Sequence, residues 1–274
     1  MAGSLVGKVA FITGAARGQG RAHAVRLARE GVDVIGVDIC GAVRTMDYPN
    51  ASPDDLAETV RLVRAQGRRM VALQADVRDY PGLKAAFDEG HAEFGRLDLI
   101  LANAGIVRYT EEAGDEFVEI WRDIVDTNLT GVFHTVRAGL QAMIDGGRGG
   151  SIVITSSSAG IRGTGSPNAG AQAYTAAKRG LVGYMQTLAN DLAPHMIRVN
   201  TIHPTGVATG MTQNEALARK AAQPDSEIAQ MRNALPIDIL QPEDIADAVA
   251  YLVSDRTRFI TGVQWPLDAG FGVR

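Results

Sequence analysis

The hydrophobic positions of this chain show two patterns that alternate along the sequence, short apolar blocks and longer stretches with helical spacing. Blocks rich in β-branched and aliphatic residues predict buried strands, and the longer stretches between them have the spacing of helices. The predicted strands are 8–13, 33–38, 69–75, 97–101, 151–157, 197–202 and 260–267. The predicted helices are 21–30, 54–66, 80–94, 115–145, 171–192, 211–235 and 242–254. This alternation predicts an α/β fold: a single Rossmann-type, doubly wound parallel sheet of about seven strands with helices on both faces.

The loop after the first predicted strand is rich in glycine. Gly14, Gly18 and Gly20 stand between this strand and the next predicted helix. Glycine lets the backbone approach a pyrophosphate, and the amino end of a helix favours its negative charge. A plain turn would explain an isolated glycine cluster, and the G-x-x-x-G-x-G spacing is not the commoner dinucleotide fingerprint. The position straight after the strand favours a cofactor site, which would also include Arg17 and Gln19.

Asp38 ends the second predicted strand, eighteen residues after Gly20. A carboxylate at this place can accept hydrogen bonds from both ribose hydroxyls of NAD and would repel the additional phosphate of NADP. Arg17 is a weaker signal for NADP, and local backbone amides could instead satisfy the aspartate. Because one arginine only partly offsets the repulsion between a carboxylate and a phosphate, the sequence predicts NAD as the cofactor.

A second cluster of reactive side chains spans residues 151–178. The strand 151–157 runs into three serines, and Tyr174 and Lys178 stand four apart at the start of an alanine-rich helix. This spacing puts both side chains on one helix face, where the ammonium would lower the pKa of the phenol from its usual value of about 10. The pair alone is weak, but its order after the strand and the serines predicts acid–base chemistry on an alcohol or a carbonyl.

Charge and composition exclude several classes of function. The formal net charge is −4 and the basic residues form no block, so neither a nucleic acid nor an anionic membrane is an expected partner. Cys40 is the only cysteine, which excludes an intrachain disulfide and suits a reducing compartment, so we expect a cytoplasmic protein. No apolar run reaches the length of a membrane span. The histidines are too dispersed to predict a metal site.

The motifs occur in a fixed order along the chain. They are Thr13-Gly14-x-x-x-Gly18-x-Gly20, Asp38, Asp76-Val77, Asn103-Ala104-Gly105, Asn128, Ser157, Tyr174-x-x-x-Lys178 and Pro204 to Thr209. This ordered set resembles the short-chain dehydrogenase/reductase family over essentially the whole chain, and it is far more specific than any of its members.

The resemblance implies a catalytic tetrad of Asn128, Ser157, Tyr174 and Lys178. Tyr174 would be the general acid and base, and Ser157 would donate a hydrogen bond to the substrate oxygen. Ser157 is chosen among the three serines because it matches the second strand-end serine of the family, before a small residue and Ala-Gly. Lys178 would bind the nicotinamide ribose and lower the pKa of Tyr174, while Asn128 would support a proton relay.

The resemblance also implies the residues that bind NAD. Asp76 can meet the adenine amino group, although capping the next helix is nearly as good an explanation. Thr205 stands where the family usually has glycine and should still line the nicotinamide pocket. The implied cofactor-binding residues are Gly14, Arg17, Gly18, Gln19, Gly20, Asp38, Ile39, Asp76, Val77, Asn103, Ala104, Gly105, Tyr174, Lys178, Pro204, Thr205, Val207 and Thr209. Members of the family usually form homotetramers through two long helices, here 115–145 and 171–192.

We expect one domain over residues 1–274, with two segments that depart from a minimal layout. Residues 39–53 form an insertion that is longer than most strand-to-helix connections. This insertion could fold over the cofactor or be an ordinary surface loop. Residues 207–235 are a candidate lid over the substrate. Bulk suggests that four residues shape the substrate pocket: Tyr109, Ile161, Arg162 and Met211.

The insertion, the Ser-Pro-Asp-Asp-Leu segment and the His-Pro-Thr-Gly element resemble one subgroup, the mycofactocin-associated enzymes, whose named type is carveol dehydrogenase. This resemblance implies that NAD is buried and non-exchangeable, and that an external redox carrier, mycofactocin, reoxidises it. The expected reaction interconverts a secondary alcohol and a ketone, with carveol-like terpene alcohols as a substrate class. Two alternatives are an ordinary 3-oxoacyl or keto reductase with exchangeable cofactor, and a catalytically silent dinucleotide-binding regulator. Asp38 and the insertion argue against the first, and the intact tetrad against the second.

Overall fold

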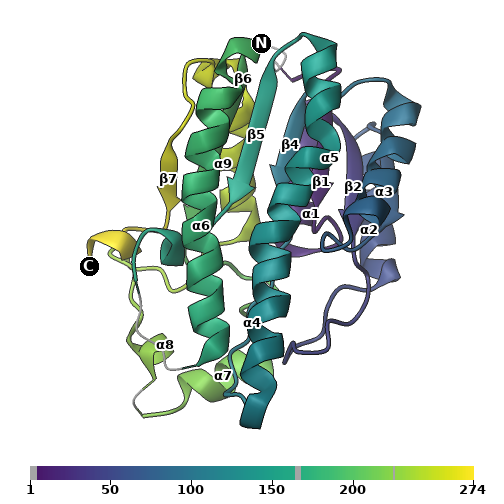
Figure 1. The fold of residues 1–274 in the computed structure, drawn as a ribbon. Coiled ribbons are helices and arrows are strands. Elements are labelled where there is room, and N and C mark those ends of the chain that lie inside the picture. The colour runs from purple at the N-terminus through teal and green to yellow at the C-terminus, as the bar shows by residue number, and fades with distance from the viewer. Residues whose placement is uncertain (1–4, 164–167, 225) are drawn as a thin grey trace.

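A seven-stranded parallel sheet lies at the centre of the molecule (Figure 1). The computed structural model describes residues 5–163, 168–224 and 226–274, so the remaining residues of the predicted 1–274 domain lie outside the described part. The strand order is β3-β2-β1-β4-β5-β6-β7, and all neighbouring pairs are parallel. The strands are β1 Val9–Thr13, β2 Asp33–Asp38, β3 Met70–Gln74, β4 Leu99–Ala102, β5 Gly150–Thr155, β6 Ile197–Pro204 and β7 Gln264–Leu267.

Helices cover both faces of this sheet, which confirms the predicted doubly wound fold (Figure 1). They are α1 Gly18–Arg29, α2 Pro53–Arg64, α3 Tyr80–Phe94, α4 Phe117–Val125, α5 Gly131–Gly146, α6 Ala169–Asp191, α7 Glu215–Ala221, α8 Glu227–Gln230 and α9 Pro242–Val253. Leu27 of α1 and Val249 of α9 belong to one buried apolar layer, and Phe87 of α3 and Leu181 of α6 belong to the other. Strands β1, β2 and β4 are buried at every position, as expected for parallel strands covered on both faces.

The carboxyl ends of the strands meet at one edge of the sheet, where open parallel sheets bind ligands. The glycine loop follows β1 there, and the insertion follows β2. A third, smaller apolar cluster joins the insertion to α4 and to the start of α6. Its buried members are Val43, Ile106, Ile120, Ile124, Ala169 and Ala173.

Three predicted elements differ from the observed ones. The predicted helix 115–145 is interrupted between α4 and α5 by a π-helical turn, η2 Asp126–Thr130. In the described residues of 211–235 the helices are the short α7 and α8, because Pro224 cannot continue a helix. The last strand is confined to β7 because Gly262 has a left-handed φ of 74°. Short 3-10 turns are η1 Gly114–Glu116, η3 Ser158–Gly160, η4 Ala193–His195, η5 Asp255–Thr257 and η6 Phe271–Val273.

Candidate active site

A pocket of about 170 Å³ lies at the carboxyl ends of β1, β2 and β4. The predicted cofactor-binding residues of the first half of the chain line it, with Gly20 as the exception. These lining residues are Gly14, Arg17, Gly18, Gln19, Asp38, Ile39, Asp76, Val77, Asn103, Ala104 and Gly105. The structure therefore gathers, around one pocket, residues that the sequence places far apart.

The glycine loop is shaped for the close approach of a ligand. Gly14 and Gly18 have left-handed φ angles of 68° and 55°, a conformation that favours glycine. A Cβ on Gly20 would collide with the carbonyl oxygen of Gly14, so this glycine permits the packing of the loop against α1. Gln19 Oε1 and Thr127 Oγ1 belong to pocket-lining residues and are buried without a hydrogen-bond partner among the described residues. The cradle and these two polar atoms fit a bound dinucleotide.

Asp38 is buried at the point where β2 meets this pocket. Its Oδ2 accepts a hydrogen bond from the backbone amide of Ala16 at 3.0 Å, and its Oδ1 accepts one from that of Cys40 at 3.1 Å. Each carboxylate oxygen can accept a further hydrogen bond. Backbone amides therefore fix the Asp38 carboxylate, as the explanation by local backbone predicted. The carboxylate still has free acceptor positions for the ribose hydroxyls, as a role in NAD binding requires.

Two other predicted cofactor residues have protein partners that the sequence did not indicate. Arg17 donates a hydrogen bond from its guanidinium to the carbonyl oxygen of Pro49, so the glycine loop contacts the insertion. Asp76 forms an ion pair with Arg78 at 2.7 Å, and Arg78 also pairs with Asp123 of α4 at 2.7 Å. Asp76 does not cap α3, whose N-cap is another residue.

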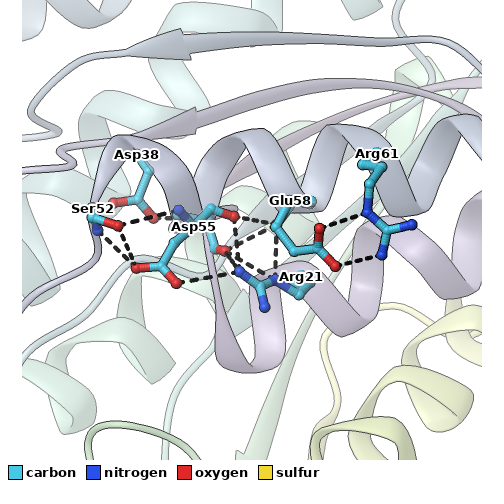
Figure 2. A network of polar contacts seen from close by, with 8 residues as sticks. Arg21, Asp38, Ser52, Asp55, Glu58 and Arg61 are labelled. Carbon is cyan, nitrogen blue, oxygen red and sulfur yellow. Dashed lines mark hydrogen bonds and ion pairs between the residues drawn. The ribbon is translucent and has the colours of Figure 1, made fainter.

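The insertion lines one side of the cofactor pocket with Val43, Tyr48, Asn50 and Ala51. Its end is fixed where α2 begins, because Ser52 and Asp55 form a reciprocal capping box (Figure 2). Arg21 of α1 donates to the backbone carbonyl oxygens of Ala16 and Asp55 and pairs with the Asp55 carboxylate at 3.5 Å. One polar network therefore holds the glycine loop, α1 and the end of the insertion together.

Ser157, Tyr174 and Lys178 come together beside this pocket. The hydroxyl of Tyr174, in α6, is hydrogen-bonded to the hydroxyl of Ser157, which follows β5. The ammonium of Lys178 donates to the carbonyl oxygen of Thr155 at 2.8 Å and lies 5.6 Å from the centroid of the Tyr174 ring. The neighbouring Ser156 instead donates from its hydroxyl to the backbone carbonyl oxygen of Lys178 at 2.8 Å.

Burial shifts the pKa of both the tyrosine and the lysine. Burial raises the pKa of Tyr174, and the hydrogen bond with Ser157 opposes this shift without cancelling it. Burial lowers the pKa of Lys178 to about 8. The sequence suggested that Lys178 lowers the pKa of Tyr174, but in this structure the pKa of Tyr174 is raised. The reason is that burial disfavours the charged forms of both Tyr174 and Lys178.

Asn128 is fully buried in the π-helical turn η2. Its Oδ1 accepts a hydrogen bond from the amide of Ile106, and its Nδ2 donates to the carbonyl oxygen of Ile106, both at 2.8 Å. A Cβ on Gly105 would lie 3.2 Å from Asn128 Oδ1 and 3.3 Å from Lys178 Nζ. The Asn128 side chain thus fixes the loop after β4 at the point where that loop passes the ammonium.

A larger cavity of about 640 Å³ lies over Ser157 and Tyr174. It shares Gln19, Asn103 and Gly105 with the cofactor pocket, so the two pockets adjoin. The predicted residues Pro204, Thr205, Val207 and Thr209 line this cavity. Tyr109 and Met211, suggested by their bulk, also line it. Ile161 and Arg162 are not among its lining residues in the described part of the chain.

Sequence reasoning pointed to the segment 207–235 as a lid but did not single out the other apolar residues of the wall of this cavity. These residues are Leu217, Ile228, Met231, Leu235, Ile237, Ile239 and Phe271. Phe271 lies in the C-terminal turn η6, and Arg162 holds it by donating to its carbonyl oxygen at 2.7 Å and by stacking 5.0 Å from its ring centroid. No local signal marks Phe271, because it reaches the cavity through tertiary contacts of the last turn.

Two kinds of feature are absent from residues 5–163, 168–224 and 226–274. None of their helices combines the length and the hydrophobicity that crossing a membrane requires. The same residues contain no group of three or more His, Cys, Asp or Glu side chains that could hold a metal ion.

Several known proteins are similar to this chain over almost its whole length. Residues 8–221 match the family model for short chain dehydrogenases. (-)-trans-Carveol dehydrogenase from Rhodococcus erythropolis is 46% identical over 272 residues, which cover 96% of this chain and 97% of that protein. Cyclohexanol dehydrogenase from Rhodococcus sp. (strain TK6) is 38% identical over 272 residues, with coverages of 97% and 96%. The crystal structure of carveol dehydrogenase from Mycobacterium avium in complex with NAD has a TM-score of 0.91 and 47% identity, covering 99% of this chain and 100% of that one.

Proposed function

The chain belongs to the short-chain dehydrogenase family and is an NAD-dependent alcohol dehydrogenase. We propose that it interconverts a cyclic, terpene-like secondary alcohol and its ketone. The observation that carries this proposal is the meeting of Ser157, Tyr174 and Lys178 where the cofactor pocket adjoins the larger cavity. The carveol and cyclohexanol dehydrogenases among its relatives support the reaction class, and the NAD-bound relative supports the cofactor.

Each residue of the tetrad has a role that its position supports. In the direction of oxidation, Ser157 donates a hydrogen bond to the substrate oxygen, and the ionised Tyr174 takes the hydroxyl proton. NAD, when bound, supplies the acceptor for the hydride of the carbinol carbon. Lys178 binds the nicotinamide ribose and stabilises the ionised tyrosine. Asn128 supports the proton relay by fixing the loop beside Lys178. In the direction of reduction, Tyr174 returns its proton to the substrate oxygen.

The remaining predicted residues hold the cofactor. Gly14, Gly18 and the amino end of α1 would bind the pyrophosphate, and Asp38 would accept the ribose hydroxyls and disfavour NADP. Residues 76–77 would bind the adenine, and residues 204–209 would line the nicotinamide part of the site. The glycine cradle and the buried Asp38 carboxylate support this assignment.

The larger cavity supports an apolar substrate. Its wall presents the aliphatic and aromatic side chains of Leu217, Met231 and Phe271, among others, together with polar side chains. Ligand pockets typically have volumes of about 300–1,000 Å³, and the 640 Å³ of this cavity accommodates a cyclic terpene alcohol. Carveol is therefore the first substrate to test.

Residues 39–53 would enclose NAD, and residues 207–235 would close over the substrate, within one domain that spans 1–274. The pocket-lining residues of the insertion and its contact with Arg17 support the first role. The cavity-lining side chains of α7 and α8 support the second. Retained NAD requires an external electron acceptor, and mycofactocin is the carrier that the subgroup resemblance implies.

A homotetramer in the cytoplasm is the proposed state of the protein. The exposed apolar residues Phe117, Val118, Trp121 and Phe133 lie on α4 and α5 and support an interface along these helices. Helix α6, packed against α4, would be the second long helix of that interface.

Cofactor retention and substrate turnover test this function separately. Protein purified without added cofactor is dialysed against isotopically labelled NAD and denatured, and the released nucleotide is weighed. Unlabelled NAD in near-stoichiometric amount supports the enclosed cofactor, whereas full replacement by label indicates an ordinary enzyme with exchangeable NAD. Carveol and cyclohexanol are then offered with an artificial electron acceptor. Oxidation that Tyr174→Phe abolishes supports the reaction, and a wild type inactive on secondary alcohols contradicts it.

A further inference from the structure

The loop after β4 forms one wall of the substrate cavity and has no regular secondary structure. Residues 103–113 contain neither helix nor strand. Val107, Arg108 and Tyr109 of this loop line the cavity. Backbone amides in such a loop need hydrogen-bond partners from elsewhere. The position of this wall therefore depends on the groups that those amides contact.

Side chains of the insertion accept hydrogen bonds from three of these amides, all in the stretch that lines the cavity or directly follows it. Asp47 Oδ2 accepts hydrogen bonds from the amides of Tyr109 at 2.9 Å and Thr110 at 2.7 Å. The hydroxyl of Tyr48 accepts one from the amide of Val107 at 3.2 Å. Asp47 and Tyr109 are 62 residues apart in the sequence. A segment that lines the cofactor pocket thus holds the wall of the substrate cavity.

Two further contacts strengthen this connection. Arg108 Nη1 donates to the backbone carbonyl oxygen of Thr45 at 3.1 Å. The hydroxyl of Thr45 donates to the carboxylate of Asp123 on α4 at 2.6 Å. This hydrogen bond anchors the insertion to α4. The rings of Tyr48 and Tyr109 also lie near each other at a tilt of 42°, with centroids 6.5 Å apart.

We propose that Asp47 is a positioning residue that sets substrate specificity, because its carboxylate fixes the backbone of Tyr109 and Thr110 and thereby places the Tyr109 ring at the wall of the substrate cavity. One carboxylate oxygen that accepts two amides makes two charge-assisted hydrogen bonds, which are stronger than neutral ones. Tyr174 and Lys178 are held independently of Asp47, because both lie on α6 and Lys178 donates to the end of β5. This inference rests on the proposed alcohol dehydrogenase function for its substrates, but the clamp itself is a property of the fold.

Three variants test the role of Asp47. Asp47→Ala leaves the amides of Tyr109 and Thr110 without their acceptor. Asp47→Asn keeps one oxygen that can accept them and removes the charge. Arg44→Ala is the matched control, because Arg44 is an exposed residue of the same insertion that pairs with Glu119 of α4 instead of the loop. The measurements are kcat and KM for carveol and for the smaller cyclohexanol, and hydrogen exchange of the amides of residues 107–110.

Asp47→Ala should lower the ratio of kcat/KM for carveol over that for cyclohexanol by about fivefold or more, mainly through the KM of carveol, as expected for the loss of about 1 kcal/mol of positioning. The amides of Tyr109 and Thr110 should exchange faster. Asp47→Asn should recover part of both effects, and Arg44→Ala should stay within about twofold of wild type. Equal losses on both alcohols, or an unchanged ratio in Asp47→Ala, would overturn the proposal, since a merely structural role moves the two substrates together.

The failure of the proposed function gives a different pattern. If the wild type oxidises neither alcohol, the assigned reaction is wrong, and hydrogen exchange alone decides the clamp. Faster exchange at residues 109 and 110 in Asp47→Ala, with no change in Arg44→Ala, then supports it. Unchanged protection overturns it. If Asp47→Ala does not fold, the same comparisons are made with Asp47→Asn, for which smaller changes in the same direction are expected.

Discussion

The cofactor side and the substrate side of this site are built in different ways. Around the cofactor pocket, the side chains lie at strand ends and are fixed by backbone groups, as Asp38 is by the amides of Ala16 and Cys40. Around the larger cavity, much of the wall is formed by apolar side chains from short helices, from loops and from the C-terminal turn. The cofactor pocket has about a quarter of the volume of the cavity, 170 against 640 Å³.

This difference separates the chemistry from the choice of substrate. Hydrogen-bonded strand ends hold Lys178 and Asn103 in one place, and hydride chemistry requires such fixed positions. Apolar contacts such as those of Leu217 and Phe271 are non-directional and tolerate changes of shape. Substitutions on the cofactor side should therefore abolish or redirect the reaction, whereas substitutions on the substrate side should change which alcohols react.

The largest effect is expected where the two sides meet. Tyr174→Phe removes the hydroxyl that we propose exchanges the substrate proton, and it keeps the aromatic ring. We expect kcat to fall by about 10³-fold, within the range for loss of a general acid or base. NAD retention, measured by mass after denaturation, should remain. Activity within tenfold of wild type would show that another group transfers the proton.

The next effect concerns cofactor choice on the rigid side. Asp38→Ala removes the carboxylate that we propose excludes the additional phosphate of NADP. The preference for NAD over NADP should therefore fall by about 30-fold, as expected for about 2 kcal/mol of charged hydrogen bonding. Asp38→Asn keeps an acceptor for one of the two backbone amides and separates loss of charge from loss of loop order. Fluorescence titration with both dinucleotides measures the preference. An unchanged preference in both variants would assign cofactor choice to other residues.

Mild acid should lower the free energy of unfolding through His23 of α1, on the cofactor side. His23 is buried without hydrogen-bond partners for its ring nitrogens among the described residues. Burial lowers the pKa of His23 from 6.5 to about 4. The unfolded chain binds the proton first as the pH falls, so this contribution to stability is present above pH 6.5 and is lost between 6.5 and 4. The loss should be on the order of 2 kcal/mol by pH 5.

Urea denaturation at pH 7 and pH 5 measures this loss. In His23→Leu the side chain cannot titrate, so the difference between the two pH values should shrink by a similar amount. His195→Leu is a control on a more exposed histidine and should behave like the wild type. Equal pH dependence in wild type and His23→Leu would assign the acid sensitivity to other groups.

The smallest effect is expected at the adaptable wall. Phe271→Ala enlarges the cavity and should raise the KM for carveol by about threefold to tenfold, because a bulky substrate loses an apolar contact worth about 1 kcal/mol. The KM for cyclohexanol should change less, and NAD retention should not change. Steady-state kinetics with both alcohols distinguish this result from a general loss of activity.

Local patterns allowed the strand-end part of the fold and site to be predicted. Strands β1, β2 and β4 are largely apolar blocks that end in, or directly before, a polar or glycine motif. Gly14, Asp38 and Asn103 could therefore be placed at one sheet edge from the sequence alone. The pairing of Tyr174 with Lys178 followed in the same way from helix periodicity.

Long-range contacts account for what could not be predicted. The hydrogen bond between Asp47 and Tyr109 spans 62 residues, and that between Arg162 and Phe271 spans 109. No local period encodes such contacts. The direction of the pKa shift of Tyr174 was also beyond the sequence, because burial by surrounding elements raises this pKa and only the hydrogen bond with Ser157 opposes the shift.

The π-helical turn η2 has a consequence for the evolution of chain length. An α-helix with an unbroken period carries one apolar stripe. Here α4 directs Ile120 and Ile124 toward the third apolar cluster, which includes Val43 of the insertion. Helix α5 instead directs Val132 and Val136 into the sheet core. The wider turn between them sets the rotational phase of one stripe relative to the other. Deleting a single residue from 126–130 would rotate α4 against α5 and leave one stripe facing water. Length changes should therefore be tolerated in the surface loops of this enzyme and rejected at this turn.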